Sequence, residues 1–244
     1  MRNIKLTIEY DGTGYHGWQV QSNLKTVQGV MKEMIARITG ERVKLIASSR
    51  TDAGVHALGQ VATFKTGSSL DARSLKRALN SVLPQDIRVK EVEEVDEAFH
   101  ARFSAKGKVY EYRILNGDLP SPFYRHFSWF VPGRLDVARM RKAAMKLVGR
   151  HDFSSFCSAG SMHRTPVREI YGIHVGQRGG FVVIQIEANA FLKQMVRNIV
   201  GTLVEVGKRK LTPSQCSAIL EARDRRRAGV AAPAQGLFLV KVNY

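Results

Sequence analysis

The sequence is poor in cysteine, with only Cys157 and Cys216 among its 244 residues. The two lie far apart and form no CxxC pair, which argues against a disulfide framework and against structural zinc. The seven histidines show no metal-ligand spacing. No apolar run is long enough to span a bilayer, and the first residues alternate like a strand instead of forming the apolar block of a signal peptide. We therefore expect a cytoplasmic protein with no metal and no membrane partner.

Acidic residues are few relative to basic ones. The chain has 38 Lys and Arg against 21 Asp and Glu, a formal net charge of +17. Solubility alone is usually met by a net charge of about 2–8, so we interpret the excess as attraction to a polyanion, with salt-sensitive binding. No basic amphipathic helix stands out to favour a membrane surface, and nucleic acid is the favoured partner. The charge run at 223–227 (RDRRR) fits a solvated turn as well as an RNA contact.

Hydrophobic periodicity predicts the same order of elements in both halves of the chain. In the first half, the apolar positions predict strands over 4–10, 43–47, 60–65 and 87–95, and helices over 27–38 and 71–82. Thr26 and Gly40 stand where the caps of the first helix should be. In the second half, the pattern predicts strands over 108–115, 170–175, 181–188 and 237–243, and helices over 137–148, over 191–206 and from Thr212-Pro213 onward.

The resulting order, strand-helix-strand-strand-helix-strand in each half, is that of the ferredoxin-like (RRM-like) fold. We predict an α+β protein of two such halves with antiparallel sheets, residues 1–104 and residues 105–244, joined near 103–107. The duplication rests on the order of elements, since the halves share no detectable sequence identity. A central cleft between two such halves is a natural ligand site.

Residues 12–17 match the GxGxxG pattern of dinucleotide-binding proteins and follow a predicted strand. That fingerprint opens directly into a helix whose N-terminus receives the pyrophosphate, whereas residues 18–23 intervene here before any helical periodicity. The acidic residue expected about 20 positions further on is Glu33, in the middle of the predicted helix. We therefore expect no nicotinamide or flavin cofactor and interpret the glycines as turn residues. The neighbouring residues that are candidates for an RNA surface are Tyr15, His16, Trp18 and Gln19.

Residues 48–56 (SSRTDAGVH) are dense in small polar side chains and lie between two predicted strands. In an extended chain Arg50 and Asp52 point to the same side, where a guanidinium favours the ionised carboxylate and fixes its orientation. Gly54 allows a sharp turn or a close approach to a ligand. The Arg-x-Asp spacing fits a loop salt bridge without function at least as well. No second acid lies nearby to form a hydrolase pair, and no HExxH, P-loop or GxSxG pattern occurs.

The longer stretch SSRTDAGVHALGQVATF, residues 48–64, resembles the signature of the TruA family of tRNA pseudouridine synthases. The resemblance covers essentially the whole chain, with no departure at the positions that matter most. The other stretches that fit the same family are YDGTGYHGWQ (10–19), KVYEYRI (108–114), GRHDFSSF (149–156) and FLKQMVRNIVGTLVEVGKRKL (191–211).

The resemblance implies the pseudouridine synthase fold and an isomerase that acts on uridines 38, 39 and 40 of the tRNA anticodon arm. The C1′–N1 glycosidic bond breaks, the uracil rotates, and a C1′–C5 bond forms. Because nothing is oxidised, reduced or hydrolysed overall, the reaction requires no cofactor. The family acts as a homodimer, so the resemblance implies tRNA and a second copy of the chain as partners.

The resemblance also implies roles for particular residues. Asp52 matches the catalytic aspartate, which either attacks the sugar or base covalently or abstracts a proton from the ribose. The sequence does not decide between these steps. Arg50 matches the arginine that pairs with this aspartate and helps hold the flipped-out nucleotide, since extruding a base from a stem costs a few kcal/mol.

Two further substrate-binding residues come from the second half of the chain. Tyr110 matches the active-site tyrosine, and its ring suits stacking on a uracil. From the residues alone a core role is favoured, because Tyr110, Tyr112 and Ile114 share one face of a strand. Arg197 lies at the edge of an apolar helix stripe and needs a partner or a cleft. The resemblance implies that it faces the active site near Asp52 or a substrate phosphate, and the alternative is a solvated position.

The remaining candidates receive weaker roles. His56 is interpreted as structural, not as a general base, and Phe153 and Phe156 as core residues. His151-Asp152 and His163-Arg164 are candidates for contact with RNA. Two other classes of protein stay open: a catalytically silent RNA-binding protein or tRNA chaperone, which does not need Asp52, and a glycosidase or nuclease with a lone carboxylate.

Overall fold

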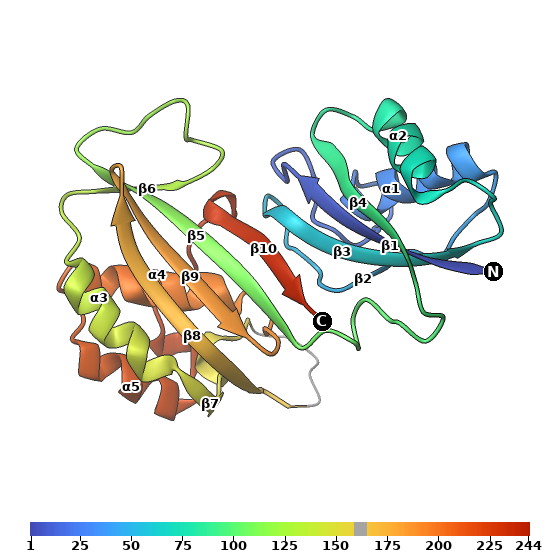
Figure 1. Cartoon of the computed structure of the whole chain (residues 1–244). Coiled ribbons are helices and arrows are strands. Elements are labelled where there is room, and N and C mark those ends of the chain that lie inside the picture. The colour runs from blue at the N-terminus through green and yellow to red at the C-terminus, as the bar shows by residue number, and fades with distance from the viewer. Residues whose placement is uncertain (159–164) are drawn as a thin grey trace. The chain divides into compact units, whose positions relative to one another are not determined.

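The computed structural model describes residues 1–158 and 165–244 and divides into two compact units (Figure 1). The first comprises Met1–Lys106 and Phe238–Tyr244, and the second comprises Gly107–Leu237. The predicted RNA contact at His163-Arg164 lies outside the described residues. Within those residues, no helix has both the length and the apolar character needed to cross a membrane.

The first unit is a sheet with two helices. Its elements are β1 (Arg2–Tyr10), α1 (Val27–Thr39), β2 (Ile46–Ala47), β3 (His56–Thr66), α2 (Ala72–Val82), β4 (Ile87–Val95) and β10 (Leu237–Asn243). Strand β1 lies between β4 and β3 and is antiparallel to both. The outer edge of β3 pairs with β2 in antiparallel and with β10 in parallel orientation. In Figure 1, α1 and α2 lie next to each other on one side of this sheet.

The helices of the first unit follow from their caps and apolar spacing. The side chain of Thr26 accepts a hydrogen bond from the amide of Gly29, and Gly40 ends α1 with a φ of +74°. Such a left-handed end favours glycine. Three side chains at helical spacing, Val27, Met31 and Ile35, are fully buried. The predicted α1, α2, β1 and β4 are confirmed.

The second unit is built in the same way. Its elements are β5 (Gly107–Gly117), β6 (Trp129–Pro132), α3 (Val137–Ala144), β7 (Gly149–Asp152), β8 (Val167–Arg178), β9 (Phe181–Ala188), α4 (Met195–Gly207) and α5 (Pro213–Ala222). The strand order is β6-β5-β9-β8-β7, and only β5 and β6 run parallel. Helix α3 packs against α4, α5 and β8. The protein is thus a mixed α/β molecule with mostly antiparallel sheets.

Several element boundaries differ from the prediction. Helix α4 begins at Met195 and not at residue 191, because Gln194 has a φ of +59° and ends the regular backbone before it. The predicted strand 43–47 is reduced to β2, and α3 ends at Ala144, followed by a single 3-10 turn. Strands β6 and β7 were not predicted, since each has only four residues and shows no clear apolar alternation.

The C-terminal strand belongs to the first unit, whereas the sequence placed residues 105–244 in one domain. Phe238 and Leu239 pair with the first two residues of β3. Gly59 of β3 lies so close to this strand that a Cβ there would come within 2.5 Å of the carbonyl oxygen of Val240. The amide of Lys106 also donates to the carbonyl of Asn243 at 2.8 Å. Such pairing between distant segments leaves no trace in local periodicity.

Candidate active site

The signature segment forms a loop, residues 48–55, between β2 and β3. We refer to it as the Asp52 loop. It contains a turn in which the amide of Val55 donates to the carbonyl of Asp52 at 3.1 Å, and Gly54 has a φ of +74° that favours glycine. The side chain of Asp52 is half-buried and that of Arg50 is exposed.

The start of the loop is held by one buried glutamine from β3. Gln60 is fully buried, and its Nε2 donates to the carbonyl of Ser49 at 2.8 Å while its Oε1 accepts from the hydroxyl of Ser48 at 2.9 Å. The amide of Ser48 donates to the carbonyl of Val61 at 2.8 Å. Because an amide side chain has both a donor and an acceptor, Gln60 fixes two successive loop residues.

The centre of the loop is held at Thr51, the residue before Asp52. Its hydroxyl lies 2.8 Å from the phenolic oxygen of Tyr10, in a buried contact. Its carbonyl accepts from the amide of Trp18 at 3.1 Å. Beneath this carbonyl lies Gly17, with a φ of +84°, where a Cβ would come within 2.6 Å of the carbonyl oxygen of Thr51. The backbone leading into Asp52 therefore has fixed neighbours on several sides.

The end of the loop is held through His56, the first residue of β3. The imidazole is 1% exposed and stacks on Phe238 with ring centroids 4.7 Å apart. Its Nδ1 accepts from the amide of Gly12 at 3.0 Å and lies 3.1 Å from a carboxylate oxygen of Asp11. This burial and these contacts support the structural interpretation of His56.

The GxGxxG segment braces the Asp52 loop. Helix α1 begins only at Val27, so the segment does not open into a helix as a dinucleotide site requires. A Cβ on Gly12 would come within 2.1 Å of the carbonyl oxygen of Val55. Tyr15 and Trp18 are buried, which corrects the expectation that these two rings line an RNA surface. His16 is exposed.

The expected ion pair between Arg50 and Asp52 is not observed within the described residues. The sequence prediction assumed an extended segment, in which the two side chains share one side. In the structure the Asp52 loop turns, with its backbone bonded to Trp18 and Tyr15.

Tyr110 and Arg197 lie in the second unit. Tyr110 is on β5 opposite Ile186, is 6% exposed, and meets the ring of Phe191 edge-on with centroids 5.0 Å apart. Its neighbour on the same strand face, Tyr112, is fully buried, and burial raises its pKa while the cation of Arg197 opposes that rise.

Arg197 is hydrogen-bonded, as its charged side chain requires in an apolar helix. It is the third residue of α4, and its Nε donates to the carbonyl of Ala232 at 2.6 Å. The amide of Ala232 donates back to the carbonyl of Arg197 at 3.0 Å. The two bonds tie α4 to the segment before β10. That segment approaches closely, since a Cβ on Gly201 would come within 1.7 Å of the carbonyl oxygen of Val230.

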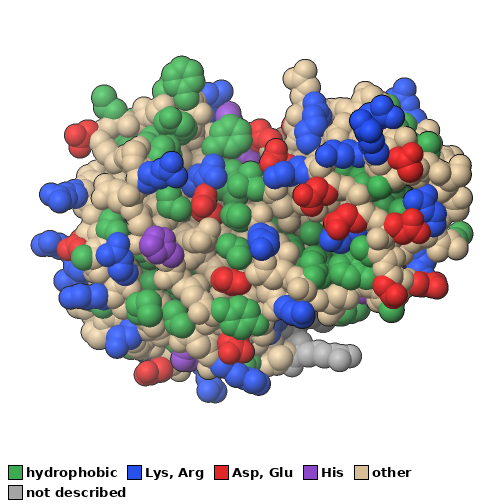
Figure 2. All heavy atoms as spheres, in the orientation of Figure 1, with side chains coloured by type: hydrophobic (Ala, Val, Ile, Leu, Met, Phe, Trp, Pro, Cys, Tyr) green, Lys and Arg blue, Asp and Glu red, His purple; other side chains and the backbone are tan. Residues whose placement is uncertain are grey.

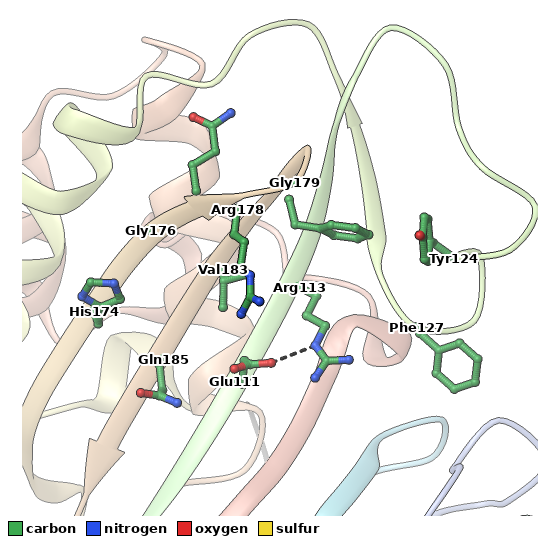
Figure 3. Close-up of a pocket in the computed structure, with 12 residues that line it drawn as sticks. Glu111, Arg113, Tyr124, Phe127, His174, Gly176, Arg178, Gly179, Val183 and Gln185 are labelled. Atoms are coloured by element: carbon green, nitrogen blue, oxygen red, sulfur yellow. Dashed lines mark hydrogen bonds and ion pairs between the residues drawn. The ribbon is translucent and has the colours of Figure 1, made fainter.

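A second region with polar side chains is a hollow of about 630 Å³ on the sheet of the second unit (Figure 3). We call it the sheet-face hollow. Residues of β5, β8 and β9 and of the loop between β5 and β6 line it, among them Glu111, Arg113, Tyr124, His174, Arg178 and Gln185. In Figure 3 Glu111 and Arg113 are joined by an ion pair of 2.8 Å. No predicted site residue lines this hollow.

The structure thus places Arg50 and Asp52 in the first unit and Tyr110 and Arg197 in the second. Sequence reasoning missed the residues that hold the Asp52 loop, namely Tyr10, Thr51 and Gln60. The signal for Tyr10 and Gln60 is a polar atom in an otherwise apolar stretch of a strand, whereas Thr51 lies in the polar signature loop itself. Among the described residues, no group of three or more His, Cys, Asp and Glu is arranged to hold a metal ion. Lys and Arg side chains are spread over the face in Figure 2 instead of gathering in one patch.

Comparison with known proteins identifies the family. A family model described as tRNA pseudouridine synthase matches residues 6–104 and 143–244. tRNA pseudouridine synthase A of Thermoanaerobacter sp. (strain X514) is 49% identical over 244 residues, and that of Acetivibrio thermocellus is 51% identical over 244 residues; each match covers 100% of both chains. A solved H/ACA RNP bound to a substrate RNA containing 2′-deoxyuridine shares 14% identity at a TM-score of 0.37, over 82% of this chain and 44% of that chain, which is too weak to carry an argument. The resemblance seen in residues 48–64 is confirmed, and the chain belongs to the tRNA pseudouridine synthase family.

Proposed function

We propose that the chain isomerises uridine to pseudouridine at positions 38, 39 and 40 of the tRNA anticodon stem-loop, with Asp52 as the catalytic carboxylate. The family match and two full-length relatives named tRNA pseudouridine synthase A support the reaction. The observation that carries the role of Asp52 is its setting: a half-buried carboxylate in the signature loop whose flanking residues are fixed by buried hydrogen bonds.

The reaction requires one group to be held close to the glycosidic bond of a nucleotide removed from its stack. The C1′–N1 bond breaks and a C1′–C5 bond forms, C5 loses its proton and N1 gains one, so the product has the mass of the substrate. A carboxylate serves either by attacking the sugar or base or by removing a ribose proton. Both routes demand a fixed carboxylate, because a misplacement of about 1 Å costs about 100-fold in rate.

The other three site residues are proposed to bind the substrate. Arg50 is exposed and within the same loop as Asp52, so we propose that it contacts a phosphate near the flipped-out uridine. Tyr110 is proposed to stack on the uracil, and Arg197 to contribute positive charge near Asp52. We also propose that each unit has the ferredoxin-like fold. The β4-β1-β3-β2 order of the first unit supports that fold for its half.

We further propose that the chain acts as a homodimer on tRNA in the cytoplasm. The excess of basic residues, +17 overall, supports a polyanionic substrate. Sedimentation of the purified chain tests the assembly: a mass of two chains is expected, and a monomer at the concentrations used for activity would contradict it.

The direct test of the proposed function compares Asp52→Asn with Asp118→Asn, an exposed aspartate in the loop after β5. We expect Asp52→Asn to bind tRNA as the unmodified protein does and to lose modification on the order of 1,000-fold, within the range for a positioned proton-transfer group. Asp118→Asn should leave both unchanged. Modification by Asp52→Asn near the rate of the unsubstituted protein would contradict the role of Asp52. Absence of modification by the unsubstituted protein would favour a silent RNA-binding protein, and released uracil or cut RNA would favour a glycosidase or nuclease.

A further inference from the structure

We propose that Tyr10 is a positioning residue for the isomerisation: its phenolic oxygen holds Thr51 and, through Thr51, the backbone that carries Asp52. The inference rests on the proposed role of Asp52 as the catalytic carboxylate. It concerns a residue at the end of β1, outside the signature segment and 42 positions before Asp52.

The ring and the hydroxyl of the buried Tyr10 have different roles. The residue is 3% exposed, and its ring lies 6.0 Å from that of Trp18, centroid to centroid. Packing of this kind needs only the aromatic ring, which phenylalanine would supply equally. A buried hydroxyl, however, costs free energy unless it is hydrogen-bonded. Its oxygen lies 2.8 Å from the hydroxyl of Thr51, so the polar atom of Tyr10 is placed against the residue that precedes Asp52.

The pairing of β1 with β3 places the phenol of Tyr10 next to Thr51. Along β1, Ile8 pairs with Gln60 and Tyr10 pairs with Ala57, so β3 has one residue more than β1 in this interval. Such a β-bulge bends the strand and redirects the side chains beside it, and bulges are frequent next to active sites. The bulge therefore lies in β3 between Gln60, which holds the start of the Asp52 loop, and Ala57, near the beginning of the strand that follows the loop.

The contact with Tyr10 differs in kind from the other contacts of Thr51. The amide of Trp18 bonds to the Thr51 carbonyl, and Gly17 packs beneath the same carbonyl. These fix the peptide plane from its oxygen side, whereas Tyr10 fixes the side chain on the Cα atom. Together they set the orientation of the Thr51–Asp52 peptide and so the direction in which the Cα–Cβ bond of Asp52 leaves the backbone. Removing one of the two leaves the peptide free to rotate by small angles.

The experiment measures single-turnover rates and tRNA affinity for four variants. Tyr10→Phe removes one oxygen and Thr51→Val replaces the hydroxyl with a methyl group of similar size, and each should lower the rate of the chemical step about 10- to 100-fold. The dissociation constant for tRNA and the midpoint of thermal unfolding should change little. Thr51→Ser keeps the hydroxyl and should recover most of the rate. The double variant Tyr10→Phe/Thr51→Val should be no slower than either single variant, because both remove the same contact.

Three results would overturn the positioning role. The first is an unchanged rate for Tyr10→Phe while Asp52→Asn is inactive. The second is a loss of rate that follows a loss of folded protein, seen as a matching fall in the unfolding midpoint. The third is a double variant whose losses multiply, since Tyr10 would then act by a route other than Thr51. Full activity of Asp52→Asn would instead overturn the proposed function, and the positioning role would fall with it.

Discussion

The Asp52 loop and the sheet-face hollow are built in opposite ways. In the loop, side chains and amides of neighbouring segments bond to successive residues, so the backbone around Asp52 is held by its surroundings. In the hollow, polar and aromatic side chains line a space on three strands and a loop, and the ion pair of Glu111 with Arg113 is one of its internal contacts. A sizeable hollow is the usual first guess for a site. We nevertheless propose the Asp52 loop as the site, because catalysis needs fixed atoms more than empty volume.

Among changes to the residues that surround Asp52, the largest expected effect comes from a side chain added beneath the loop. Gly17→Ala places a Cβ within 2.6 Å of the Thr51 carbonyl oxygen at a backbone with a φ of +84°. We expect modification to fall about 100-fold, and the first unit to be destabilised by about 1–3 kcal/mol. Single-turnover rates and chemical unfolding measure the two effects.

The matched control is Gly14→Ala in the same segment, where a Cβ would meet nothing within 4 Å. It should leave both the rate and the stability nearly unchanged. Equal behaviour of the two glycine variants would show that the segment does not hold the Asp52 loop.

An intermediate effect is expected from Arg50, the exposed cation of the loop. Because Arg50 and Asp52 form no observed ion pair within the described residues, Arg50→Ala should weaken tRNA binding about tenfold and lower the slope of log affinity against log salt by about one, as for the loss of one phosphate contact. Stability should not change. Titrations at several salt concentrations check this, with the exposed Arg42→Ala as control. An unchanged salt slope with a lost chemical step would place Arg50 on the carboxylate instead.

The smallest effect is expected in the sheet-face hollow. Arg113→Ala removes a partly exposed ion pair of the kind that contributes about 0–1 kcal/mol, and modification should stay within about twofold of the unmodified rate. For Arg178→Ala, too, the rate of modification should change by no more than about twofold. A tenfold fall in the rate of modification for either variant, with unfolding unchanged, would bring the hollow into the catalytic account and break the contrast with the Asp52 loop.

Local pattern was enough to predict much of the fold. The caps at Thr26 and Gly40, the apolar spacing of α2 and the alternation in β1 and β4 are all short-range signals, and the structure confirms them. The predicted boundaries of helices were wrong where one residue interrupts the helical backbone, as Gln194 does before α4. The pairing of β10 with β3 joins residues far apart in the chain, and periodicity carries no information on it.

The residues of the candidate site show the same difference between what local sequence predicts and what depends on contacts between distant segments. Asp52 could be singled out because a long contiguous motif surrounds it. The Arg50–Asp52 ion pair was inferred from spacing and is not among the contacts seen in the described residues. Spacing predicts the direction of a side chain only for an extended backbone, and this loop turns. Tyr10, Gly17 and Gln60 could not be connected to Asp52 from sequence, since their contacts depend on how β1, β3 and the segment before α1 pack together.

We propose that Asp52 is required for pseudouridine formation in the anticodon arm. Mapping pseudouridines in unmodified tRNA treated with the protein and with Asp52→Ala tests it most directly. We expect new pseudouridine at positions 38, 39 and 40 with the protein, and none with Asp52→Ala at equal tRNA occupancy. Pseudouridine at those positions with Asp52→Ala, or modification confined to other positions, would contradict it.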